Sequence, residues 1–166
     1  MVGYFAGVSI TTGNSNTAVG SFALDANTTA SNNTAVGYNS LTANTTGTEN
    51  VAVGKGAGDA ITTGTNNAFF GSGTGTDLTT GASNVGIGKD SLYNAVDGWG
   101  TVAIGRECVY TSTKYDKGVL IGYKAGRELD GSTGNAAGAV AIGAYAMYRI
   151  EEGGYKSIAI GEEALY

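Results

Sequence analysis

The feature that most constrains this chain is a glycine that returns at every seventeenth position. Each of these glycines, called anchor glycines below, ends a short run of small apolar residues such as Ala52-Val53-Gly54. The interval keeps this value seven times in succession and then becomes 21 and 18, for the anchor glycines Gly3, Gly20, Gly37, Gly54, Gly71, Gly88, Gly105, Gly122, Gly143 and Gly161. A period this constant indicates stacked structural units rather than one irregular core.

Other positions keep the phase of the anchor. Three residues after it stands a small residue, often followed by Leu, Met, Val or Gly, which predicts a second short buried segment. Glycine seven residues before the anchor predicts a turn with positive φ, at Gly13, Gly47, Gly64, Gly81, Gly98 and Gly154. Asparagine four residues before the anchor predicts a hydrogen-bonded stack from coil to coil, at Asn16, Asn33, Asn50, Asn67 and Asn84.

The length of the repeat selects the fold. A unit of this length is too short for a helical hairpin and too rich in β-branched residues for one helix, whereas two short strands and two turns fit it. We therefore expect an all-β protein with a single domain over residues 1–166, a parallel β-solenoid of about ten coils. Each coil would add roughly 4.8 Å to the rod. Ala or Gly at the strand centres predicts that the two walls of a coil lie very close together.

The predicted strands are apolar on both faces. In Val102-Ala103-Ile104 successive side chains point to opposite sides, and neither side is polar. One side faces the coil interior, and the sequence contains no helix or second domain to cover the other, so we expect another copy of the chain there. The residues predicted at this oligomer interface are Val102, Ile104, Ile121, Val140, Ile142, Ile158 and Ile160.

Composition excludes several functional classes. The net charge of -5 and the 14% of charged residues offer no basic surface for nucleic acid or for a membrane. No run is long enough to cross a bilayer, and residues 1–5 lack the features of a secretion signal. Histidine is absent and Cys108 is the single cysteine, so we expect no catalytic residue, no metal site and no cofactor.

Local motifs that suggest ligand binding fit the repeat better. Residues 54–58 (Gly-Lys-Gly-Ala-Gly) resemble a phosphate loop, but Gly56 stands where a hydroxyl residue is needed. Residues 73–78 match one calcium-binding nonapeptide, yet that chemistry uses consecutive copies. Cys108 occupies the small-residue position of its repeat and is interpreted as a core residue.

The two halves of the chain differ. Residues beyond Thr80 hold eight of nine Lys and Arg and eight of ten Tyr, and four additional residues between Asp130 and Gly138 predict a loop. Aromatic side chains can bind a host glycan or protein, or can stack between coils and join them. The candidate binding residues are Trp99, Tyr110, Tyr115, Tyr123, Tyr145, Tyr148 and Tyr155.

The repeat resembles a known family. Residues 33–37 (Asn-Thr-Ala-Val-Gly), 50–54 and 101–105 are similar to the head repeats of trimeric autotransporter adhesins, and such repeats also occur in phage tail-fibre and virion surface proteins. The resemblance implies a left-handed parallel β-roll assembled as a homotrimer. The period of this chain is longer than the adhesin repeat. We also expect a free-standing chain that starts at its own Met1 without stalk, coiled coil, membrane anchor or signal peptide, which favours a virion component.

We therefore expect a non-catalytic structural protein on the surface of a phage or virus particle, forming a fibre, spike or capsid decoration that contributes to host attachment. Its open coil ends would be covered by other virion or fibre proteins. The alternative is the head of a bacterial adhesin on the cell surface, binding glycans or matrix proteins. An ice-binding solenoid is a third class, disfavoured because the threonines are expected to drift from turn to turn.

Overall fold

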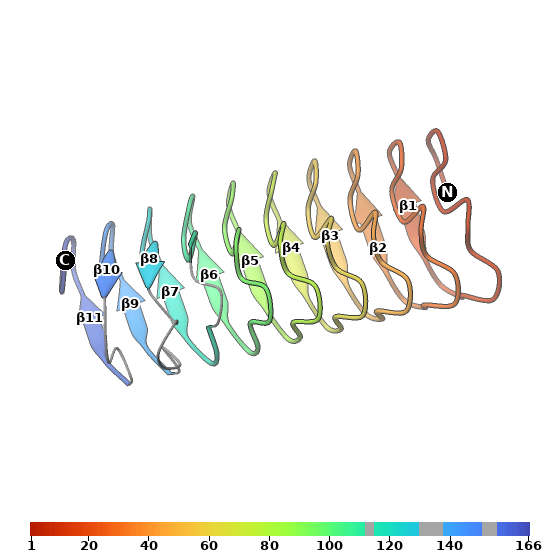
Figure 1. Ribbon diagram of the computed structural model, residues 1–166. Coiled ribbons are helices and arrows are strands. Elements are labelled where there is room, and N and C mark those ends of the chain that lie inside the picture. The colour runs from red at the N-terminus through yellow and green to blue at the C-terminus, as the bar shows by residue number, and fades with distance from the viewer. Residues whose placement is uncertain (112–114, 130–137, 151–155) are drawn as a thin grey trace.

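The computed structural model describes residues 1–111, 115–129, 138–150 and 156–166. Over these ranges the chain is a parallel β-solenoid whose coils follow the period of the anchor glycines and stack side by side into a rod, with the two termini at opposite ends (Figure 1). No helix occurs in the described ranges. The all-β solenoid predicted from the repeat is confirmed. The predicted loop at Asp130 to Gly138 lies outside the described residues except for Gly138. Gly154 also lies outside them.

One wall of the rod is a nine-stranded parallel sheet. Each strand has three residues and pairs in register with the next coil, so that Ala35 lies between Ala18 and Ala52. At the N-terminal end Val2 forms a further bridge with Val19. The strands are β1 (Thr17–Val19), β2 (Thr34–Val36), β3 (Val51–Val53), β4 (Ala68–Phe70), β5 (Val85–Ile87), β6 (Val102–Ile104), β7 (Val119–Ile121), β9 (Val140–Ile142) and β11 (Ile158–Ile160).

The core lies inside the coils and is one residue wide at the sheet. The central side chain of each strand points inward and is fully buried, as at Ala35 and Ala52, while the first and third side chains point outward. The small centres let the opposite wall reach the strand backbone. Ser40 Oγ donates to the carbonyl of Ala52 at 2.9 Å, and Ser91 Oγ donates to that of Ala103 at 3.0 Å. The prediction of closely packed walls is confirmed.

The opposite wall is mostly not a strand, and the expectation of two strands in every coil is wrong. Strand pairing on this side is limited, among the described residues, to β8 (Glu128–Leu129) and β10 (Arg149–Ile150). The physical reason is the backbone conformation after the anchor glycine. Two and four residues beyond it φ is positive, for example 56° at Asn39 and 51° at Leu41, and a strand requires negative φ.

The asparagine stack forms as predicted and does more than join asparagines. Asn67 Nδ2 donates to Asn50 Oδ1 at 3.0 Å and to the carbonyl of Gly81 at 2.9 Å. Asn67 Oδ1 accepts the backbone N–H of Asn84 at 3.0 Å. The Asn67 side chain thus joins the preceding coil and the following coil to its own, and a buried hydrogen bond left unmade costs about 1–3 kcal/mol.

The glycines before these asparagines are required for a reason other than the predicted positive φ, which is absent at Gly13, Gly47, Gly64, Gly81 and Gly98. A Cβ on Gly64 would lie 2.5 Å from the carbonyl oxygen of Gly81 in the next coil. The close approach of backbone to backbone therefore favours glycine in this column, because the coils are only one strand spacing apart, although Ala30 and Tyr115 occupy it in two coils.

The threonines keep better register than expected. Five Thr-Thr pairs, beginning at Thr11, Thr28, Thr45, Thr62 and Thr79, recur with the period of the anchor glycines. The first hydroxyl of a pair bonds to the next coil, as where Thr45 Oγ1 donates to the carbonyl of Thr62 at 3.1 Å. The expected drift is wrong at these positions. The second threonine of each pair is exposed, so these residues form one exposed column along the rod. In the coil after Thr80 the same position is occupied by Asp97.

Candidate functional site

The residues predicted at an oligomer interface lie together on the outer face of the nine-stranded sheet. Their register places Val102, Val140 and Ile158 in one column and Ile104, Ile121 and Ile142 in the other. In the single chain, those in β6 and β7 are half-buried, whereas Ile142 is 37% exposed and Ile160 is 69% exposed. The outward positions of the nine strands carry no charged residue. We call this surface the outer strand face.

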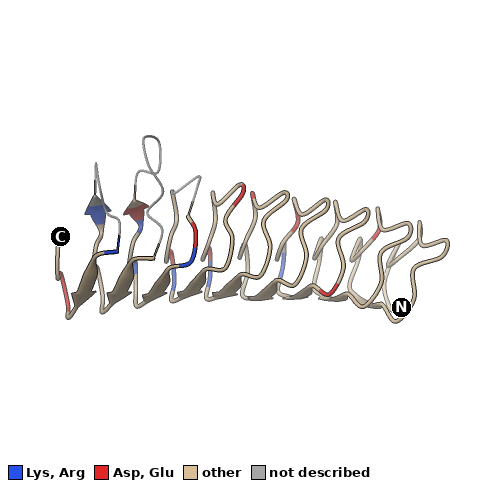
Figure 2. Ribbon diagram, turned by 90° about the horizontal axis from the view of Figure 1, so that it is seen from below, with Lys and Arg blue, Asp and Glu red and all other residues tan. Residues whose placement is uncertain are grey.

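A second surface runs along the edge where the chain leaves each strand. It consists of the residues one, two and five positions after the anchor glycines, and its composition changes along the rod. At the N-terminal end Tyr4 packs against Phe5 and Phe22 at centroid distances of 4.2 and 5.7 Å, and Phe22 meets Tyr38 at 6.1 Å. In the C-terminal half charged residues join the aromatic ones, and Figure 2 shows charged segments concentrated there.

Aromatic and guanidinium groups form a continuous stack in this C-terminal half. Tyr93 stacks on Tyr110 with centroids 4.9 Å apart and an interplanar angle of 17°. The Arg127 guanidinium lies 5.1 Å from the Tyr110 ring and 5.8 Å from the Tyr148 ring, and Tyr148 stacks on Tyr166 at 5.3 Å. One residue per coil thus continues the stack, and each contact joins neighbouring coils.

A charge cluster lies beside this stack. The Glu107 carboxylate is 2.9 Å from Arg106, 3.1 Å from Arg127 and 3.8 Å from Lys124. Partial burial disfavours its ionised form, but the hydrogen bond from Arg127 and the charges of Lys124 and Arg106 together lower the pKa of Glu107. The carboxylate therefore fixes three cations in place and stays ionised near neutral pH.

The structure brings some of the candidate binding residues together and separates others. Tyr123 contacts Tyr145 at 5.2 Å, Tyr145 contacts Tyr148 at 5.6 Å, and Tyr110 joins them through Arg127. Trp99 is 47% exposed but lies on a different edge, in a turn before the strand, with Lys117 Nζ 4.8 Å from its ring centroid. Tyr155 lies outside the described residues.

Tyr115 is not on the surface, because it is fully buried. It occupies the column that holds glycine in most earlier coils, and its ring fills the space above Gly118, where earlier coils carry the stacked asparagine. Burial raises the pKa of its phenol, and the hydroxyl has no hydrogen-bond partner among the described residues. The predicted contribution of Tyr115 to a binding surface is therefore wrong; it packs the core where the asparagine stack ends.

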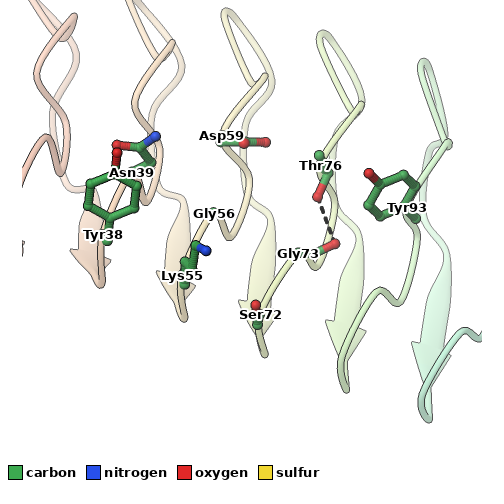
Figure 3. A pocket seen from close by; sticks show the side chains of 9 residues that line it. All are labelled: Tyr38, Asn39, Lys55, Gly56, Asp59, Ser72, Gly73, Thr76 and Tyr93. Atoms are coloured by element: carbon green, nitrogen blue, oxygen red, sulfur yellow. Dashed lines mark hydrogen bonds between the residues drawn. The ribbon is translucent and has the colours of Figure 1, made fainter.

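A hollow of about 220 Å³ opens on the edge between the two aromatic regions. Its lining spans four successive coils, from Tyr38 at one end to Tyr93 at the other (Figure 3). The remaining lining residues are Asn39, Lys55, Gly56, Asp59, Ser72, Gly73 and Thr76. Both motifs that resemble ligand loops, residues 54–58 and 73–78, contribute to it, although neither is used in the way its motif suggests.

The sequence analysis missed this hollow, although a signal was present. Gly56 and Gly73 stand two residues after successive anchor glycines, where other coils carry larger residues such as Asn39 and Asp90. Those residues adopt the same positive φ, 56° at both Asn39 and Asp90, so the backbone does not require glycine here. Two consecutive missing side chains leave the edge open.

Metal-binding clusters and membrane-spanning helices are both absent from the described residues. No cluster of three or more His, Cys, Asp or Glu that could hold a metal ion is found in this part of the chain. None of its elements is an apolar helix of the length that a bilayer requires. Comparison with models of known protein families, with curated proteins and with solved structures found no match.

Proposed function

We propose that this protein is a non-catalytic structural component of a phage or virus particle, a homotrimeric left-handed β-roll of about ten coils that forms a fibre, spike or capsid decoration. The observation that carries the proposal is the outer strand face, an apolar surface that runs along the sheet without a charged residue. Monomeric proteins avoid an exposed apolar patch of this kind, so a partner covers it in the assembled protein.

The geometry of the outer strand face favours a second copy as that partner. Its apolar columns repeat at the strand spacing of the coils, and another copy of the chain carries columns with the same spacing. Side chains of two such surfaces can interdigitate along the full rod, which a partner without the repeat cannot achieve. We propose three copies because the repeat resembles the trimeric head repeats of autotransporter adhesins. The alternative head of a bacterial adhesin would use the same assembly, and antibody labelling of particles or cells distinguishes the two.

Analytical ultracentrifugation of the wild-type chain and of two variants tests this proposal. We expect the wild type to sediment at three times its 16.6 kDa. Ile104→Asp places a charge in the outer strand face without touching the core, so we expect the trimer to dissociate. Thr63→Asp is the matched control, because Thr63 is exposed on another edge and Asp97 occupies the same column; it should remain trimeric. A wild-type chain that is a stable monomer at micromolar concentration would refute the assembly.

A further inference from the structure

The hollow between Tyr38 and Tyr93 exists because two successive coils carry glycine, at Gly56 and Gly73, in the position two residues after the anchor. A Cβ on Gly56 would lie 3.5 Å from Asp59 Oδ2, which is ordinary contact, so a larger residue could stand there. The φ of +63° at Gly56 is close to the 56° that Asn39 adopts in the preceding coil. Packing and backbone conformation therefore permit a larger residue at this position, and the glycine leaves the surface open.

The ends of the hollow are aromatic. Tyr93 stacks on Tyr110 with centroids 4.9 Å apart and stands at the end of the hollow, in the coil next to that of Thr76 (Figure 3). Tyr38 is 50% exposed at the opposite end. The two tyrosines belong to coils three strand spacings apart, which is roughly 14 Å along the rod. Rings held by neighbouring coils present rigid apolar surfaces that need no ordering when a ligand binds.

The floor of the hollow is polar and carries both kinds of charge. Neither Lys55 nor Asp59 is held in a salt bridge in the part of the chain that is described. Asp59 Oδ1 is buried with no hydrogen-bond partner among the described residues, while Oδ2 lies toward Gly56. Thr76 Oγ1 donates to the carbonyl of Gly73 at 2.8 Å, which fixes the hydroxyl oxygen as an acceptor. The floor thus offers donors from Lys55 and acceptors from Asp59 and Thr76 within one open site.

We propose that this hollow binds a short neutral saccharide. A sugar presents hydroxyl groups that both donate and accept, which suits a floor with acceptors and donors of opposite charge. Its apolar C–H faces pack on tyrosine rings, and the spacing of Tyr38 and Tyr93 suits an oligosaccharide rather than one ring. A strongly anionic or cationic ligand would leave Asp59 or Lys55 opposed by a like charge. The inference goes beyond the structural role proposed above and does not depend on trimer formation.

Titration of the full chain with maltotriose, cellotriose and triacetylchitotriose tests the site, with binding followed by saturation-transfer and amide-shift NMR. We expect at least one of these saccharides to bind and to shift amides around Lys55, Gly56 and Gly73. Gly56→Asn fills the hollow and should weaken binding at least about tenfold. Tyr38→Ala removes one aromatic end and should weaken it as well. Neither change alters the outer strand face, so the sedimentation of both variants should equal that of the wild type.

Gly100→Asn is the matched control. Gly100 has φ +66°, close to that of Gly56, and its column holds asparagine in other coils, but it lies away from the hollow. This variant should bind saccharide as the wild type does. The proposal is overturned if none of the three saccharides binds the wild type, if Gly56→Asn binds as tightly as Gly100→Asn, or if a neutral Gly-Ser tetrapeptide binds at this site and the saccharides do not.

Discussion

Several buried residues of this protein other than glycine have a positive φ, a backbone conformation that ordinarily favours glycine. Leu24, Leu41, Leu92 and Val109 have φ between 51° and 53° and are at most 1% exposed. A residue other than glycine in this conformation costs on the order of 1–3 kcal/mol. Burial of a leucine side chain contributes about 1.5–3 kcal/mol, so the two effects nearly offset. Because the two effects nearly offset, this column can hold leucine in some coils and glycine in others, as at Leu41 and Gly58.

Cys108 provides a test of burial at the scale of one residue. Its side chain is fully buried, its Sγ lies 3.4 Å from the carbonyl oxygen of Leu120, and burial raises the pKa of its thiol from 9.0 to about 12. In the unfolded chain the thiol ionises first, so the contribution of Cys108 to stability is fully present below pH 9.0 and is lost as the pH rises to about 12. We expect a loss of up to about 1.4 kcal/mol per pH unit in that window.

Urea unfolding of the wild type and of Cys108→Ala between pH 8 and 11 measures this contribution. Alanine occupies the same column at Ala57 and Ala125, so the variant should fold and should show a flatter dependence on pH. Native protein should also react with a thiol reagent only as fast as it opens. A Cys108 that reacts at the rate of the unfolded chain, or an unchanged slope in Cys108→Ala, would contradict this account.

At the scale of the element, each strand centre is matched in size to the turn opposite. Most coils with alanine at the strand centre carry a larger apolar residue four residues after the anchor, as in the pairs Ala35 with Leu41 and Ala103 with Val109. The exception is Ala52 with Gly58, where a Cβ on the glycine would lie 3.2 Å from the Phe69 ring of the next coil. Where the centre is Phe69, the corresponding residue is Gly75, on which a Cβ would lie 2.9 Å from the Phe69 ring. A large side chain at the strand centre thus stands opposite a glycine in its own coil, because the two would otherwise overlap.

A double-mutant cycle on Phe69 and Gly75 tests this matching. Phe69→Ala alone should lower the free energy of unfolding by about 3–5 kcal/mol, because it leaves a cavity. Gly75→Leu alone should lower it by about 1–3 kcal/mol, because the leucine overlaps the ring. In the Phe69→Ala background, however, Gly75→Leu should raise stability, because it recreates the Ala-Leu pair of other coils. Urea unfolding of the four chains measures the coupling, and additive effects would contradict the matching.

The sequence predicts those elements in which the same residue type recurs in successive coils and contacts its equivalent in the next coil. The anchor glycines and the stacked asparagines meet identical residues in the next coil, so a shared column in the sequence is also a contact in space. The turn wall was missed because its leucines adopt positive φ, which hydrophobic pattern does not reveal. The hollow was missed because its only signal is that Gly56 and Gly73 replace the larger residues found in this column in other coils, and such a signal matches no known motif.

At the scale of the whole molecule, the rod is a one-dimensional array. Contacts between strands of the main sheet join only neighbours, such as β3 with β4 and β4 with β5. Coils in the middle have a neighbour on both sides, whereas coils at the ends have one, so stability should be highest in the centre. Strands β3 to β6 combine this position with the asparagine stack, which extends from Asn16 to Asn84 and the amide of Thr101.

Hydrogen exchange measured by mass spectrometry should therefore show a gradient along the rod. Amides of β4 and β5 should exchange only by global unfolding, while those of β1 and β11 should open at free energies close to zero. Asn67→Ala, in the middle of the stack, should lower protection of β4 and β5, whereas Asn16→Ala should affect only the N-terminal coils, because Asn16 is partly exposed and bonds on one side of the stack. If all strands exchanged together with one opening free energy, the rod would behave as a single cooperative unit, and nearest-neighbour stacking would not describe its stability.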